Sequence, residues 1–268
     1  AASAPTLYYF CHYHSGMGGQ ANTNSTLGSS NFDGTVTPAN EVPIVKVNPS
    51  AGFSIVKYKG QAGDSNGNYK IGHGLGVAPE LIITKRTDTS GNGWWTHTTA
   101  GDKTLDWAAL NLTQAFQNND GYYYQLPTNL VFDDDDNFTA DGADAIAYLF
   151  SSVTYFSKIG RYTGNGSADG PFIHLGFRPA FFIQKIWSGG TGGWYIFDSK
   201  RAGYNVDNDI LVADTLDAGF DGQTNPRLDF LSNGVKWRDA GSAVHNASGS
   251  VYIYIAIAEA PSKNSRAR

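Results

Sequence analysis

The chain repeats its own pattern at an interval of about a hundred residues, and this repeat constrains the fold more than any other feature. A Gly-x-x-Pro motif ends at Pro79 and again at Pro179. A Gly-rich turn leads into Trp94 and again into Trp194. A long internal repeat of this kind indicates two units of one fold, placed one after the other.

Short apolar runs predict that both units are built from β-strands. Residues 53–58 and 158–162 open the two repeats, and the long runs 145–150 and 250–259 close them. The turn Ser232-Asn233-Gly234 between two apolar runs predicts a hairpin. The 32 glycines and the 13% of aromatic residues suit strands joined by tight turns. We therefore predict an all-β fold of two tandem antiparallel β-sandwich repeats, jelly-roll-like, with an extended N-terminal arm.

The same patterns divide the chain into five segments. The stretch 104–116 is long enough for a helix, but its Thr and Asn residues favour strand and loop equally well. Residues 42–47 could add one edge strand to the first repeat. The predicted segments are a terminal strand with its loop (1–19), a linker or extended arm (20–51), repeat 1 (52–152), repeat 2 (153–261) and a polar tail (262–268).

Composition argues against several classes of partner. The net charge is -5, so the chain has no general basic surface for nucleic acid. No apolar run approaches the roughly 18 residues that a membrane span needs. The single Cys excludes an intrachain disulfide. We expect neither nucleic-acid binding nor a membrane span.

The N-terminal segment carries residue types that bind copper. A strand over residues 7–10 leads to Cys11, His14 and Met17 on one short loop. A thiolate, an imidazole and a thioether are the ligands of blue-copper sites, and the C-x-x-H-x-x-M spacing resembles the ligand loop of cupredoxins. Cupredoxins take a second His from an upstream strand, so the resemblance implies an incomplete site in a processed or partial chain. The alternative is a terminal strand that pairs with another subunit.

A second metal prediction rests on a run of acidic residues. Asp133, Asp134, Asp135 and Asp136 form the densest charge in the chain. Four carboxylates in a turn repel one another unless they are solvated or bind a cation, and calcium prefers such oxygen ligands. The alternative is a solvated loop. Apart from these calcium-like and copper-like residues, we expect no cofactor.

Aromatic residues beside Gly-rich loops are candidates for sugar binding. Trp187 precedes the loop 188–193, and Tyr122, Tyr123 and Tyr124 follow a polar turn. Flat aromatic faces at such positions could contact glycans. The alternative is that they fill the sandwich cores, as strand tryptophans usually do.

No catalytic motif is present in the sequence. The chain lacks the nucleophile elbow, the zinc-protease helix and the phosphate-binding loop. Glu occurs only at positions 41, 80 and 259, and a glycosidase needs two facing carboxylates. We therefore expect a protein that is not an enzyme.

Four motifs resemble a tandem-repeat β domain of bacteriophage structural proteins. That domain is frequent in tail-fibre-like virion proteins of marine phages, cyanophages included, where a cupredoxin-like segment can precede it. The motifs are Tyr-Thr-Gly-Asn-Gly from Tyr162, Gly-Phe-Arg-Pro-Ala-Phe from Gly176, Trp-Tyr-Ile-Phe-Asp from Trp194 and Leu-Asp-Phe-Leu-Ser-Asn-Gly from Leu228.

The resemblance implies a structural component of a phage virion surface, extracellular in location. It would be a tail fibre or appendage that binds a host-surface glycan. Its partners would be further copies of itself, with a trimer favoured because three copies bury open strand edges, and other virion proteins. The alternatives are a capsid decoration protein, a free lectin-like module and, least supported, a glycan-degrading tailspike-like enzyme.

Overall fold

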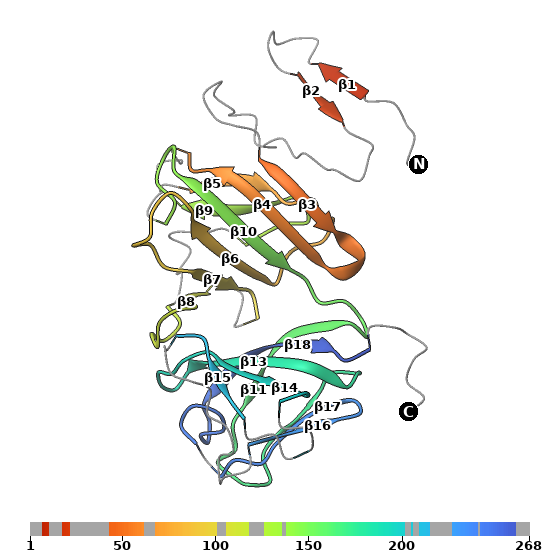
Figure 1. Ribbon diagram of the computed structural model, residues 1–268, viewed down its shortest axis with the longest axis vertical. Helices are drawn as coiled ribbons and strands as arrows, with labels where there is room; N and C mark the ends of the chain where they lie inside the picture. The colour runs from red at the N-terminus through yellow and green to blue at the C-terminus, as the bar shows by residue number, and fades with distance from the viewer. Residues whose placement is uncertain are drawn as a thin grey trace. The chain divides into compact units, whose positions relative to one another are not determined.

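In a computed structural model of the chain, the regular secondary structure is almost entirely β-strand, which confirms the predicted all-β class. The sheets are antiparallel, and their connections are loops and turns (Figure 1). The backbone is described for residues 7–10, 18–21, 43–61, 68–100, 106–117, 126–135, 138–201, 205, 209–214, 227–240 and 242–260.

Contacts divide the chain into two compact units. Unit 1 comprises Ala1–Asn92 and Asp120–Phe150, and unit 2 comprises Gly93–Asn119 and Ser151–Arg268. The sequence predicts a boundary at residue 152, which agrees except for residues 93–119. The contacts place this segment, hereafter the inserted segment, in unit 2 because its apolar side chains pack there.

Unit 1 is a sandwich of two layers. Its buried core lies between them and includes Val56, Ile71, Phe132 and Leu149. The 3-10 turn Pro49–Ala51 joins the strand Ile44–Asn48 to the strand Phe53–Lys59. In the larger layer the strands lie in the order β3 (Ile44–Asn48), β4 (Phe53–Lys59), β10 (Asp144–Phe150) and β6 (Leu81–Arg86), and the smaller layer pairs β5 (Asn68–Gly72) with β9 (Val131–Asp135).

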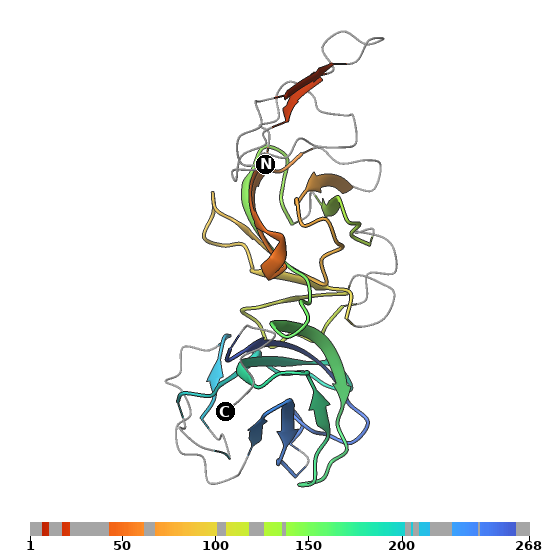
Figure 2. The ribbon, with the colours of Figure 1, turned by 90° about the vertical axis from the view of Figure 1, so that its right-hand side faces the viewer.

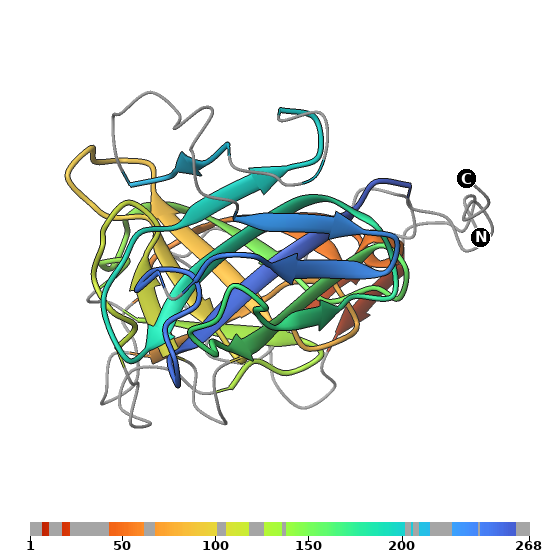
Figure 3. The same cartoon turned by 90° about the horizontal axis from the view of Figure 1, so that it is seen from below.

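Unit 2 repeats this architecture with a larger core. Figure 2 shows its two layers of strands. Phe182, Phe197, Trp237 and Tyr252 belong to the buried core of this unit. One layer has the order β11 (Ser157–Thr163), β18 (Val251–Ala258), β13 (Pro179–Ser188), β14 (Tyr195–Asp198) and β15 (Leu211–Val212). The other, in front in Figure 3, has the order β12 (Phe172–His174), β17 (Gly234–Trp237) and β16 (Leu228–Leu231). The hairpin β16–β17 confirms the prediction at Ser232-Asn233-Gly234.

The inserted segment forms the hairpin β7 (Trp95–Thr98) and β8 (Asp106–Ala109) and covers the second face of the larger sheet in unit 2. Ala108 and Phe116 pack there against Trp194 and Ile253. Strand and loop, not helix, therefore occupy the described part of 104–116. Both faces of this sheet are buried, one by its own sandwich partner and one by the inserted segment.

The internal repeat is visible at the level of single hydrogen bonds. In unit 1, Gly142 donates its backbone N–H to Gly60 over 2.9 Å, and in unit 2, Gly249 donates to Gly164 over 3.0 Å. Gly142 and Gly249 have φ values of 75° and 78°, which an L side chain rarely adopts. These turns join the closing strand of each unit to its opening strand, as the sequence repeat predicts.

The N-terminal segment contains a separate two-stranded pairing, β1 (Leu7–Phe10) with β2 (Gly18–Ala21). The strand predicted over residues 7–10 is confirmed. The copper-like residues Cys11, His14 and Met17 lie outside the described residues, as do most of the predicted arm and all of the tail.

Candidate functional site

A cavity of about 290 Å³ lies in unit 2 beside β14 and β15. Five separate stretches of chain contribute to its wall, from the inserted segment to the turn before β18. Its lining residues are Thr113, Gly193, Tyr195, Ile210, Val212, Asp214, Arg227, Ser242, Val244 and His245.

Sheet pairing positions one wall of the cavity. Tyr195 on β14 lies opposite Val212 on β15, and both pack half-buried against the unit 2 core. The inserted segment brings Thr113 to the rim, where its carbonyl accepts a hydrogen bond of 3.2 Å from Gly192 N–H. The cavity therefore depends on the inserted segment as well as on the second repeat.

Asp214 has one carboxylate oxygen in use and one unpaired. Its Oδ1 accepts a hydrogen bond of 3.2 Å from the backbone N–H of Trp194. Its Oδ2 is buried and has no hydrogen-bond partner in the described part of the chain. Gly193 leaves room for this carboxylate, because a Cβ there would crowd Asp214 Oδ1. A buried carboxylate oxygen without a donor is costly, so this atom is suited to receive one from a ligand.

Arg227 carries the opposite charge, and it likewise has one nitrogen that is hydrogen-bonded and one that is not, among the residues described. Its Nη1 donates to Asp239 in an ion pair. Its Nε is buried and has no hydrogen-bond partner among the residues described. Asp239 Oδ1 also accepts from Ser242 N–H at 3.2 Å, which fixes the turn that forms the opposite wall. The Arg227 charge is therefore compensated, while one donor remains unused.

His245 is a neutral hydrogen-bond donor. Burial, and to a smaller extent the nearby Arg227 charge, lower its pKa to about 3. The Gln184 side-chain N–H₂ donates to Val244 O at 3.0 Å and lies 2.8 Å from His245 Nδ1. Nδ1 therefore accepts, and the imidazole proton resides on Nε2. The ring stacks on Trp237 at 5.2 Å between centroids.

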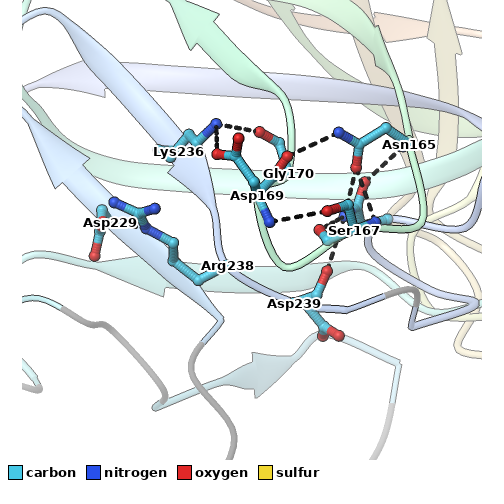
Figure 4. A network of polar contacts seen from close by, with 9 residues as sticks. Asn165, Ser167, Asp169, Gly170, Asp229, Lys236, Arg238 and Asp239 are labelled. Carbon is cyan, nitrogen blue, oxygen red and sulfur yellow. Dashed lines mark hydrogen bonds and ion pairs between the residues drawn. The ribbon is translucent and has the colours of Figure 1, made fainter.

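A polar network fixes the turn that carries His245 (Figure 4). The fully buried Asn246 side chain donates to Ser167 O and to Asp239 O, both at 2.8 Å. Its Oδ1 accepts from Asn165 N–H at 2.9 Å. These hydrogen bonds connect the loop 163–170 to the cavity wall.

Lys236 contacts the end of the loop 163–170, at Asp169 and Gly170. Its Nζ lies 2.7 Å from Asp169 Oδ1 and donates to Gly170 O at 2.5 Å. The hydrogen bond from Lys236, and then its charge, lower the pKa of the Asp169 carboxyl. Arg238 follows the same strand as Lys236 and pairs at 2.6 Å with Asp229 on the neighbouring β16. The network thus holds the loop in place by charge as well as by amide hydrogen bonds.

Trp187, which the sequence suggests as a sugar-binding residue, makes its contacts within unit 2. Its indole N–H donates to Asp106 Oδ2 at 2.6 Å, and its half-buried ring packs in the cluster beneath the inserted segment. The Arg161 guanidinium lies 6.0 Å from the ring centre. This placement favours the core alternative for Trp187. Tyr122, Tyr123 and Tyr124 lie outside the described residues.

The acidic run does not form the turn that a calcium site would need. Asp133, Asp134 and Asp135 are buried on β9, and Asp136 lies outside the described residues. Asp134 accepts hydrogen bonds from Tyr58 at 2.5 Å and Tyr69 at 3.0 Å, and burial raises its pKa.

The three described residues therefore lie on a buried strand and not in a solvated loop, and calcium binding by this run stays a prediction. Successive side chains on a strand point to opposite faces, which separates these carboxylates. The described residues contain no group of three His, Cys, Asp or Glu side chains placed to hold a metal ion.

Sequence reasoning missed the residues of the cavity. Tyr195, Asp214, Arg227 and His245 are separated by 13 to 19 positions and share no motif. The only local signal is the Gly-rich loop before Trp194-Tyr195, where Gly193 makes room for Asp214. Their convergence follows from sheet topology, which spacing along the chain does not reveal.

The fold and the cavity define an all-β sandwich protein with a small pocket lined by polar and apolar side chains. The chain belongs to the family described as a domain of unknown function (DUF7483), which it matches over residues 21–261. No curated protein and no solved structure matches it. Within the described residues, no helix is both long and apolar enough to cross a membrane.

Proposed function

We propose that this chain is a non-enzymatic structural component of a phage virion surface, most simply a tail-fibre or appendage subunit that binds a host-surface glycan. It would act outside the cell as a homo-oligomer, with a trimer favoured, beside other virion proteins. Nucleic-acid binding has no part in this proposal.

The observation that carries the proposal is the repeated sandwich. Three strands of the larger layer share one order in the two units, β4–β10–β6 in unit 1 and β11–β18–β13 in unit 2, and the same Gly–Gly hydrogen bond closes each unit. Serial β units of this kind present several sets of loops on one chain, and such loops can face a partner. The phage-like motifs at Tyr162 and Gly176 lie on the strands and turns that build the second unit.

Open strand edges support self-association. β3 and β11 each end the larger layer of their unit, so each presents one unpaired edge within the described part of the fold. Such edges favour pairing with another chain unless they are blocked. A second copy is the simplest partner because every copy carries the same edges.

Light scattering on the full chain and on a chain lacking residues 1–42 tests the assembly. The deletion stops before Pro43 because β3 pairs with β4 and belongs to unit 1. We expect a trimer for the full chain and a smaller species after deletion. A monomer in both forms would contradict the fibre-subunit proposal.

The cavity favours a second candidate, a free lectin-like module. A binding site without assembly would serve such a protein. A monomeric full chain that still binds sugars would select this candidate over the virion subunit. Assembly with or without sugar binding would select the structural role.

A further inference from the structure

We propose that the unit 2 cavity binds one neutral sugar ring, with adjacent hydroxyls hydrogen-bonded to Asp214 and Arg227. This inference rests on the proposed glycan binding and assigns it a site and a ligand class. It concerns unit 2 alone and does not require any particular oligomer.

The two unpaired atoms define what the ligand must offer. Among the described residues, Asp214 Oδ2 lacks a donor and Arg227 Nε lacks an acceptor. The two side chains line one cavity yet form no ion pair with each other. A ligand that donates to one and accepts from the other satisfies both. A hydroxyl group does either, so a pair of neighbouring hydroxyls does both.

Charge compensation argues for a neutral ligand. The Arg227 guanidinium already faces the Asp239 carboxylate, so an acidic ligand would find no free positive charge. Because Nη1 already donates to Asp239, the guanidinium offers a ligand hydrogen-bond donors and no uncompensated charge. Burial lowers the pKa of Lys185, and the Asp214 carboxylate opposes this by favouring the charged ammonium.

The remaining walls fit the amphipathic surface of a sugar. Tyr195, Ile210 and Val212 offer apolar and aromatic surface for ring C–H groups. His245 Nε2–H and the hydroxyls of Ser242 and Thr113 belong to residues of the same lining. The volume of about 290 Å³ lies at the lower end of the roughly 300–1,000 Å³ of ligand pockets, which suits a single ring.

Saturation-transfer NMR on the full chain tests the site directly. The probes are glucose, galactose, mannose and N-acetylglucosamine, with glycine and acetate as charged comparators. We expect at least one sugar to bind with a dissociation constant on the order of millimolar. Neither charged comparator should bind.

Two variants connect the binding to the cavity. Asp214→Asn turns the unpaired acceptor into an N–H₂ donor and should weaken binding about tenfold or more. Val212→Phe leaves every polar group in place but fills the cavity, and should abolish binding. Asp198→Asn is the matched control, because Asp198 in the same unit pairs with Arg201 and does not line the cavity. It should bind like the unchanged chain.

Three results would overturn the inference. One is binding of glycine or acetate in place of sugars. Another is sugar binding that both cavity variants retain with unchanged melting temperatures, which would move the glycan site elsewhere and leave the proposed function intact. The third is no sugar binding in a chain that assembles as a trimer, which would separate the structural role from this cavity.

Discussion

His245 contacts both the core of unit 2 and the cavity. Because its ring is neutral in the folded protein, acid lowers the free energy of unfolding. The ring is 2% exposed, stacks on Trp237 and receives an amide hydrogen bond from Gln184. His97 in the inserted segment is 1% exposed, and burial lowers its pKa to about 3 as well. Both imidazoles are therefore neutral when folded and protonated when unfolded over a wide acidic range.

We predict that the free energy of unfolding falls as pH drops from 6.5 toward 3. Above pH 6.5 both states are neutral and the full stability is present, while below it the unfolded state binds more protons. The slope is about 1.4 kcal/mol per pH unit for each histidine. Urea unfolding at pH 7 and pH 4 measures it.

The variant His245→Gln removes one of these titrating groups. It should flatten the dependence on pH, whatever it does to stability at pH 7. The exposed His174 serves as the control, and His174→Gln should leave the slope unchanged. An identical slope in the unchanged chain and in His245→Gln would show that this ring is not held neutral by the fold.

At the scale of the element, Asn246 joins two loops that the sequence places 80 residues apart. Its side chain makes four hydrogen bonds, to Asn165 twice and to Ser167 and Asp239 once each. Backbone hydrogen bonds hold this loop at Gly164, Gly166 and Gly170, and the Asn246 amide adds side-chain hydrogen bonds to it. Sequence alone suggests only that Asn246 is a turn residue.

We predict that Asn246→Ala lowers the free energy of unfolding by about 2–4 kcal/mol, because it leaves buried backbone groups unpaired. Chemical denaturation measures the change. The control is Asn233→Ala, since Asn233 is exposed in the β16–β17 turn and contributes through its backbone carbonyl. Equal stability of the two variants would show that the Asn246 side chain does not stabilise the loop 163–170.

At the scale of the whole molecule, the inserted segment belongs to the first sequence repeat but packs in unit 2. Unit 2 therefore needs residues from both repeats. Lys185 shows this best, since its buried ammonium donates to Leu112 O at 3.1 Å and to Gly192 O at 2.5 Å. The indole of Trp194 donates to Ala109 O at 3.2 Å. Without the inserted segment, these groups and the apolar face around Ile183 and Ile253 would meet water.

We predict that residues 151–260 alone expose this face and bind a hydrophobic dye strongly. Adding a peptide of residues 93–119 should reduce the dye signal, and a scrambled peptide of the same composition should not. Dye fluorescence and light scattering measure both effects. A chain of 151–260 that is monomeric and silent toward the dye would show that unit 2 folds independently.

The sequence by itself determined the all-β class, the repeat and most strand positions. Alternation, Gly-rich turns and the Ser232-Asn233-Gly234 hairpin are local signals, because a strand or turn depends on a few neighbouring residues. The matching glycines of the two repeats could be paired from sequence because the turn needs a positive φ at the same place in each unit.

Only the tertiary structure decided where distant side chains meet. It buried the acidic run on β9, covered the ring of Trp187 with the inserted segment and assigned residues 93–119 to unit 2. It also brought Tyr195, Asp214 and Arg227 to one cavity. The physical reason is that burial and hydrogen-bond satisfaction depend on which strands become neighbours in a sheet, and strand order is a property of the whole chain.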